Sequence, residues 1–130
     1  MMKMTRGTLQ ALAGAAILAA AASPALAHHS ANAEFDTSKE VTMTGTLVEV
    51  QAIAPHSHWI FMIKNAQGTA EKWDVEGAAP TVLRRQGVQV KEQIKPGETY
   101  SFLALPGWSG HVAYLVGITI DGKDYRIQKL

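Results

Sequence analysis

Most of the chain beyond residue 40 carries its hydrophobic residues in alternation or in short runs, and this pattern predicts strands rather than long helices. Val41–Val50 is rich in β-branched residues and predicts a first strand, in which Gly45 indicates a bulge or a sharp coil. His58–Lys64 is largely apolar on both faces, which is typical of a central strand. Thr69–Glu76 alternates cleanly between its two faces, so we expect a third strand with one face in water.

The second half of the chain predicts one short helix and three more strands. Pro80–Gln86 is the expected helix, because proline is tolerated in a first turn and Gly87 can end the last one. Val88–Ile94 is ambiguous, and Asp121-Gly122 predicts a tight hairpin turn. The three further strands are expected at Thr99–Leu105, His111–Ile120 and Lys123–Gln128.

This order of elements predicts an all-β domain with one short helix. A five-stranded barrel with a helix between its third and fourth strands is the oligonucleotide/oligosaccharide-binding (OB) arrangement, so we expect an OB-like β-barrel of five to six strands. An open β-sandwich is the alternative. OB folds bind ligands with the loops after strands one and four, which here carry Pro55–His58 and Trp108–His111. The fold therefore predicts that histidines far apart in sequence share one rim.

The first 27 residues predict a signal peptide rather than a part of the fold. Lys3 and Arg6 give a basic start, and Leu9–Ala22 follows as an apolar, alanine-rich run. Ala25-Leu26-Ala27 then forms a small-residue cleavage box. A transmembrane anchor is the alternative, but the apolar run is shorter than the roughly 20 residues that a membrane span needs. We therefore expect cleavage after Ala27, export to the periplasm and no membrane attachment of the mature chain.

Cleavage would leave residues 28–130, which is the length of one domain. We expect an extended arm at residues 28–39, docked through Phe35, and a barrel at residues 40–130. Loss of the two basic residues near the start leaves ten basic residues against 11 acidic ones, so no electrostatic footprint for nucleic acid is present. The chain has no cysteine, which excludes disulfides and thiolate metal sites. The expected partner is a small ligand or a periplasmic protein of unknown identity.

All five histidines follow the expected cleavage site, and they are the candidate metal ligands: His28, His29, His56, His58 and His111. Cleavage makes His28 the first residue, which then offers both its α-amine and its imidazole to one ion. A second histidine completes a three-nitrogen set, and nitrogen ligands in tetragonal geometry suit Cu(II). The alternative is that residues 28–30 are only a soluble spacer.

The loop after the first predicted strand carries a second candidate pattern. His56 and His58 are two residues apart, and in an extended segment such residues point to the same side. The alternative is that His56 caps the loop while His58 packs at the strand start beside Trp59. In the loop after the fourth strand, Trp108 lies between glycines and is the candidate ligand contact, whereas His111 alone is more often a hydrogen-bonded structural residue.

Seven short motifs resemble an exported bacterial family known as domain of unknown function family 6152. The motifs are His28-His29-Ser30, Phe35-Asp36, Gly45-Thr46, Pro55-His56, Trp73 with Val75-Glu76, Leu83-Arg84-Arg85 with Gly87, and Lys95-Pro96-Gly97-Glu98. Two positions depart from the family pattern, namely Ala54, where asparagine is usual, and Val88, where an aromatic residue is common. The resemblance implies export and a small single domain, and it implies no established activity.

Three functions are compatible with these residues. The first is an exported periplasmic β-barrel that binds copper through His28, with help from His56 or His58 and with His111 as a further candidate ligand. The second is a metal-free ligand-binding or protein-binding module that uses the same loop rim. The third is a metal-dependent enzyme, which would need a carboxylate such as Glu34 or Glu49 among the histidines. No nucleophile motif or phosphate loop is present, so no catalytic residue is predicted.

Overall fold

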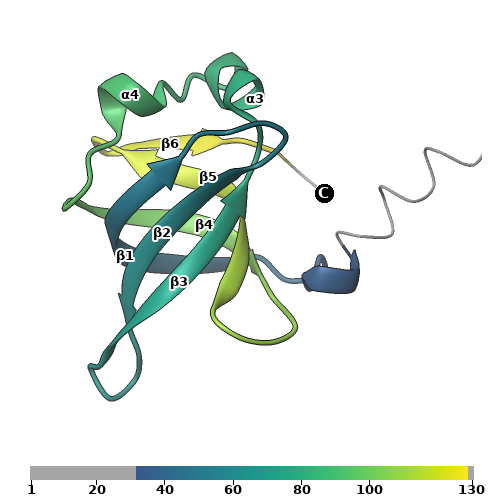
Figure 1. Cartoon of the computed structure of the whole chain (residues 1–130), viewed down its shortest axis with the longest axis vertical. Coiled ribbons are helices and arrows are strands. Elements are labelled where there is room, and N and C mark those ends of the chain that lie inside the picture. The colour runs from purple at the N-terminus through teal and green to yellow at the C-terminus, as the bar shows by residue number, and fades with distance from the viewer. Residues whose placement is uncertain (1–31, 129–130) are drawn as a thin grey trace, which may run out of the picture. The chain divides into compact units, whose positions relative to one another are not determined.

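Strands dominate the computed structural model, which describes residues 32–128 of the chain (Figure 1). From Glu34 onward these residues form one compact unit. The strands within this part of the chain are β1 Val41–Gln51, β2 Ser57–Lys64, β3 Ala70–Gly77, β4 Thr99–Pro106, β5 Val112–Ile120 and β6 Lys123–Arg126. Two short helices, α3 Pro80–Arg85 and α4 Val90–Gln93, connect β3 to β4.

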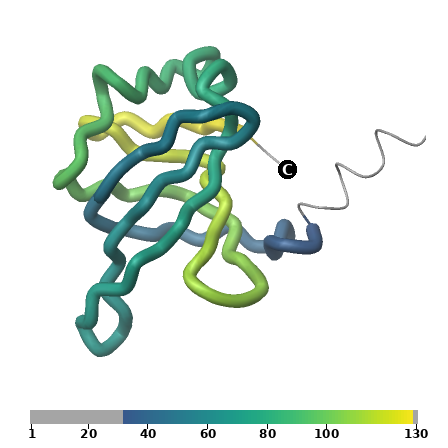
Figure 2. The backbone as a smooth tube through the Cα atoms, in the orientation of Figure 1, coloured from purple at the N-terminus to yellow at the C-terminus, as the bar shows by residue number. Residues whose placement is uncertain are grey.

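The strands form one sheet in the order β3-β2-β1-β4-β5-β6, and a further pairing closes five of them into a barrel. This pairing is parallel and joins Asp74–Glu76 of β3 to Val112–Tyr114 of β5. β6 extends the sheet beyond the closed ring by pairing with β5, and both helices lie across one end of the barrel (Figures 1 and 2). The arrangement confirms the predicted OB-like barrel of five to six strands and is not the open sandwich.

β1 curls around the barrel and changes partner along its length. Its first half pairs with β4 and its second half with β2, and both partners meet it at Thr46. A Cβ atom on Gly45 would lie only 2.8 Å from Cγ1 of Ile63, so glycine here permits the close approach of β2. The bulge itself falls between Leu47 and Glu49 rather than at Gly45.

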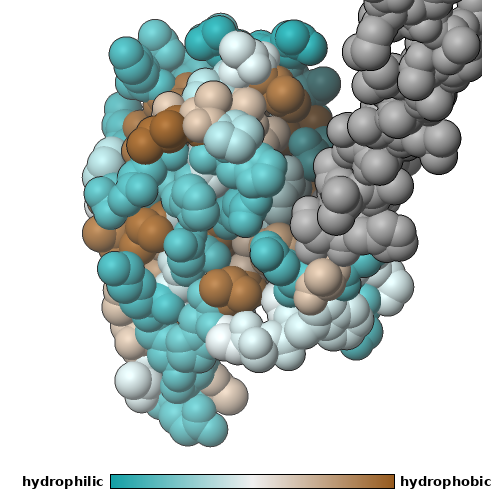
Figure 3. All heavy atoms as spheres, turned by 45° about the vertical axis from the view of Figure 1, so that its right-hand side comes forward, coloured by the Kyte–Doolittle hydropathy of each residue, from teal (hydrophilic) through white to brown (hydrophobic). Residues whose placement is uncertain are grey.

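The barrel interior holds the largest apolar side chains, since alternate residues of each strand point inward. Phe61 and Phe102 stack with ring centroids 4.5 Å apart, and both are almost completely buried. α3 adds Leu83, which is fully buried, so this helix helps to close one end of the barrel. The face of the molecule shown in Figure 3 is mainly hydrophilic with small separate hydrophobic patches.

Both helices between β3 and β4 are short. α3 begins with proline in its first turn and ends just before Gln86, close to the predicted range. α4 is a single turn, which resolves the ambiguous Val88–Ile94 segment as partly helical. In the part of the chain that the structure describes, no helix is long and apolar enough to cross a membrane.

The segment before β1 docks on the outside of the barrel. Phe35 forms a β-bridge with Gly107, and the backbone N–H of Asp36 donates to the carbonyl of Pro106 at 2.8 Å. The Phe35 ring is buried in a second apolar cluster with Leu105, Tyr114 and Val116. Docking through this ring was expected from the sequence, whereas residues 28–31 of the predicted arm lie outside the described residues.

Candidate functional site

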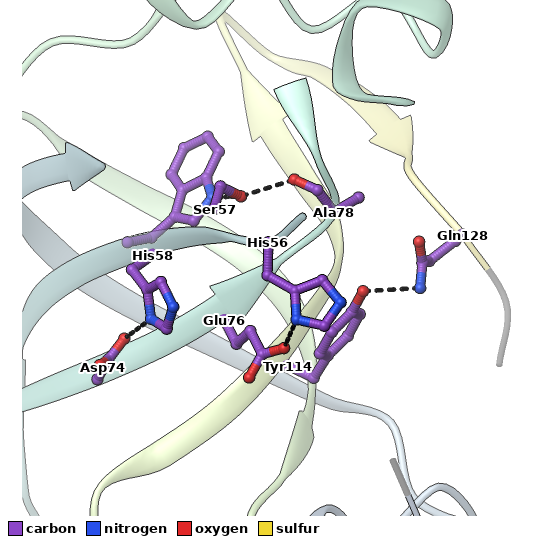
Figure 4. Close-up of polar contacts among 9 residues, drawn as sticks. His56, Ser57, His58, Asp74, Glu76, Ala78, Tyr114 and Gln128 are labelled. Carbon is purple, nitrogen blue, oxygen red and sulfur yellow. Dashed lines mark hydrogen bonds and ion pairs between the residues drawn. The ribbon is translucent and has the colours of Figure 1, made fainter. Parts of the chain in front are cut away.

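Two histidines occupy the outer face of the β2–β3 hairpin, as their spacing predicts. Nδ1 of His58 lies 2.9 Å from Oδ1 of Asp74, and Nδ1 of His56 contacts Oε1 of Glu76 (Figure 4). The register pairs His58 with Glu76 directly, so each histidine reaches a carboxylate diagonally across the two strands. Both carboxylates belong to the wet face of β3 that the alternating pattern predicts.

The residue between the two histidines fixes this segment to the barrel. The Ser57 hydroxyl is fully buried and donates to the carbonyl of Ala78 at 2.8 Å, while Nε1 of Trp59 donates to the same hydroxyl at 2.9 Å. A Cβ atom on Gly77 would lie 2.8 Å from that hydroxyl oxygen, so a glycine leaves the space that Ser57 uses. The inward Ser57 thereby directs the residues on either side of it outward.

Replacement of Ser57 by alanine is expected to lower the free energy of unfolding by about 1–3 kcal/mol. The substitution leaves the buried indole N–H of Trp59 and the buried carbonyl of Ala78 without their partner. Equilibrium urea unfolding measures the loss, and Ser109→Ala in an exposed loop is the matched control with an expected change near zero. Equal stability of the two variants would contradict the anchoring role of Ser57.

The two carboxylate contacts orient the imidazoles. They engage Nδ1 of both rings, so Nε2 is the remaining nitrogen of each ring. The side chains are 52% exposed for His56 and 41% exposed for His58, so both rings are partly accessible from solvent. Metal-binding histidines commonly have their second nitrogen held by a carboxylate in this way. The geometry of the pair is therefore compatible with metal binding through Nε2.

These two imidazoles do not make a complete metal site by themselves. Among the described residues 32–128, no three side chains of the His, Cys, Asp and Glu types are grouped so that they could hold a metal ion. His28 and His29, the remaining candidates of the predicted mature N-terminus, lie outside the described residues. The described barrel thus offers two nitrogen ligands on one face, and further ligands have to come from elsewhere.

His111 lies on the other side of β3. Its ring stacks on Trp73 with centroids 5.1 Å apart, and its Nε2 lies 3.3 Å from Oε2 of Glu71. Trp73 and Asp74 are consecutive in the strand, so their side chains point to opposite faces. The structure consequently does not bring the His111 ring to the pair formed by His56 and His58. The fold does place His56 and His111 in the loops after β1 and β4, as the sequence predicts.

Trp108, Glu49 and Glu34 were also singled out in the sequence. The Trp108 side chain is 61% exposed in the loop between β4 and β5. The carboxylate of Glu49 accepts a hydrogen bond from Gln51 at 3.2 Å and meets none of the described histidines. The backbone carbonyl of Glu34 accepts a hydrogen bond from the N–H of Trp108 at 3.1 Å. The carboxylates that contact the three described histidines all come from β3.

Tyr114 is a site neighbour that the sequence reasoning missed. Its ring meets the His56 ring edge-on, with centroids 6.4 Å apart, and its hydroxyl accepts a hydrogen bond from Nε2 of Gln128 at 2.9 Å (Figure 4). Burial, together with the nearby Glu76 carboxylate, raises the pKa of the Tyr114 phenol. The residue therefore presents a neutral ring to His56 at physiological pH.

Comparison with known proteins gives one match. The model of a family described as "Family of unknown function (DUF6152)" matches residues 15–116. No curated protein and no solved structure matches the chain significantly. The description assigns no activity, so a function has to be argued from the residues and the geometry above.

Proposed function

We propose that this chain, which belongs to the family of unknown function DUF6152, is an exported periplasmic protein that binds copper on a small β-barrel. The observation that carries the proposal is the pair formed by His56 and His58. Both side chains lie on one outer face, and each has Nδ1 held by a carboxylate, which leaves Nε2 as the nitrogen for a ligand. This arrangement resembles the ligand-and-carboxylate pairs of protein metal sites.

The proposed ligand set combines this pair with His28. After cleavage behind Ala27, His28 contributes an α-amine and an imidazole, and the barrel contributes the imidazoles of His56 and His58. Together they form an all-nitrogen donor set, which in tetragonal geometry suits Cu(II). Thiolate ligands are excluded because the chain has no cysteine. The amine must lose its proton to bind, so the affinity for copper rises with pH.

The docked segment before β1 is linked to the histidine pair through one intervening ring. Glu34 is fixed by its carbonyl, which accepts a hydrogen bond from Trp108, and His28 precedes Glu34 by six residues. Residues 32–34 are helical, so only the four residues from 28 to 31 can be counted as extended, and they span at most about 14 Å. From the docked Phe35, one ring contact of 5.6 Å leads to Tyr114 and a second of 6.4 Å leads to His56. The docked Phe35 is thus two ring contacts away from His56, and His28 precedes Phe35 by seven residues.

The copper proposal predicts different roles for the three described histidines. His56→Ala and His58→Ala are each expected to weaken Cu(II) binding about tenfold or more, because each removes a nitrogen ligand. His111→Ala is the matched control and should leave the affinity unchanged, since its ring lies against Trp73 on the other face of β3. Competition titration with a chelator of known affinity, on protein beginning at His28, measures all three variants. Equal effects of the three substitutions would exclude the proposed ligand set.

A metal-free binding module is the second candidate, and the exposure of two loop side chains favours it. Ile53 after β1 is 64% exposed and Trp108 after β4 is 61% exposed. Large exposed apolar side chains in these two loops suit a ligand or protein partner, because OB folds bind through them. Under this alternative, metal chelation leaves ligand binding and the accompanying change in tryptophan fluorescence intact, whereas Trp108→Ala removes that change.

A further inference from the structure

Tyr114 lies between the docked segment before β1 and the candidate ligand His56. We infer that Tyr114 is a positioning residue that couples the docking of residues 34–36 to the orientation of the His56 ring. Copper binding and docking of this segment then strengthen each other. The inference rests on the proposed copper site and deepens it. It names the contacts by which the barrel holds residues 34–36 close to the candidate ligand His56.

One side of Tyr114 receives the docked segment. The Phe35 ring meets the Tyr114 ring edge-on at 5.6 Å and 63°, and both side chains are about 95% buried. Three backbone contacts hold the same segment, namely the bridge from Phe35 to Gly107 and the bonds between Asp36 and Pro106 and between Trp108 and Glu34. Any displacement of the segment therefore moves or uncovers the Tyr114 ring.

The other side of Tyr114 faces the histidine. Its ring meets the His56 ring at 6.4 Å and 90°, and Glu76, which holds Nδ1 of His56, pairs with Tyr114 in the parallel register of β3 and β5. Gln128 fixes the phenol from the C-terminal side at 2.9 Å. His56 itself lies in a loop, so the carboxylate and the tyrosine ring are the described side chains that restrict its ring.

These contacts make a short path of packed rings from Phe35 through Tyr114 to His56. Close-packed side chains transmit displacement, because a gap of even a fraction of an ångström forfeits their attraction. Coupling between two binding events is reciprocal, so an ion that fixes His56 must stabilise the docked segment by the same factor by which docking raises the affinity for the ion. Typical couplings of this kind are about 5-fold to 150-fold.

Amide hydrogen exchange and copper titration together test the coupling. In protein beginning at His28, one equivalent of Cu(II) is expected to slow exchange at the Asp36 and Trp108 amides at least about fivefold. Phe35→Leu, which keeps an apolar side chain but removes the ring edge, is expected to lower the copper affinity by a similar factor. Tyr114→Phe keeps the ring and should retain the coupling. Copper that binds without changing exchange at Asp36 would overturn the inference.

A matched control separates positioning from general destabilisation. Tyr100→Phe removes the hydroxyl that accepts the Lys95 N–H at 2.9 Å, in the main core and away from His56. This variant is expected to unfold more easily and to keep its copper affinity. A loss of affinity equal to that of Phe35→Leu would show that stability alone explains the effect, and would contradict positioning by Tyr114.

A copper-free measurement distinguishes this inference from the proposed function. In the metal-free protein, the nuclear magnetic resonance signals of the His56 ring are expected to shift in Phe35→Leu and those of His111 to stay in place. Shifted His56 signals in a protein that binds no copper would support positioning and overturn the copper proposal. Unchanged His56 signals would overturn the positioning role whether or not copper binds.

Discussion

Protein that carries one extra residue before His28 is expected to bind Cu(II) at least about 100-fold more weakly than protein that begins at His28. An added residue converts the α-amine into a peptide nitrogen and so removes a chelating ligand from the ion. Loss of outer partners alone already costs metal sites about 10-fold to 100-fold, and loss of a direct ligand should exceed that. Chelator competition at fixed pH measures both proteins, since protonation of the amine shifts the apparent affinity.

The matched control carries its extra residue after Leu130 and leaves the amine of His28 free. This control should bind copper like the protein that begins at His28. Sequencing of the N-terminus of protein recovered from the periplasm is expected to begin at His28, as cleavage after Ala27 predicts. Equal copper affinity with and without the extra N-terminal residue would remove His28 from the site, even if cleavage occurs as expected.

Phe61→Ala is expected to lower the free energy of unfolding by about 3–5 kcal/mol. The side chain is fully buried and stacks on Phe102 at 4.5 Å, so alanine leaves a cavity between β2 and β4 as well as losing apolar burial. A domain of this size has a total stability of about 5–15 kcal/mol, and the substitution therefore removes a large share of it. Equilibrium urea unfolding measures the change.

Two controls define this core effect. Phe61→Leu keeps most of the buried volume and should lose markedly less stability than the alanine variant. Trp108→Ala removes a larger side chain, but one that is 61% exposed, and should change the free energy of unfolding by no more than about 0.5 kcal/mol. If Phe61→Ala and Trp108→Ala had similar effects, the barrel interior described above would be wrong.

Local pattern was enough to place most of the elements. The alternation along Thr69–Glu76 and the apolar run His58–Lys64 correspond to β3 and β2 within one residue at each end. The pairing of β3 with β5 that closes the barrel could not be recognised in the sequence pattern of either strand. It joins segments about 40 residues apart and depends on the curl of β1. Val88–Ile94 stayed ambiguous because a four-residue helix is too short to show a helical period.

The site was predictable as far as it depends on one strand. A period of two correctly put His56 and His58 on one side, since that rule acts between neighbours in sequence. Their partners Asp74 and Glu76 require the register across the β2–β3 hairpin, which could have been counted from the turn at Asn65–Gly68. The side of β3 that His111 occupies depends on how the β4–β5 loop folds back, and no pattern within the loop determines it.

Tyr114 escaped notice for a different reason. It lies in the apolar run Val112–Ile120, where a tyrosine looks like an ordinary core residue. The structure instead places it on the outer side of β5, under Phe35 and beside His56, in a second apolar cluster. A side chain that is buried by a docked segment rather than by the barrel cannot be recognised from the pattern of apolar and polar residues in its own strand.

Titration of Cu(II) into protein that begins at His28, followed by electron paramagnetic resonance, tests the central claim most directly. The account predicts a single type 2 spectrum with nitrogen coupling that saturates at one copper per chain. The spectrum should change in His56→Ala or His58→Ala and persist in His111→Ala. A heterogeneous spectrum without nitrogen coupling, or one unaffected by both ligand variants, would contradict a copper site built from His28 and the histidine pair on the barrel.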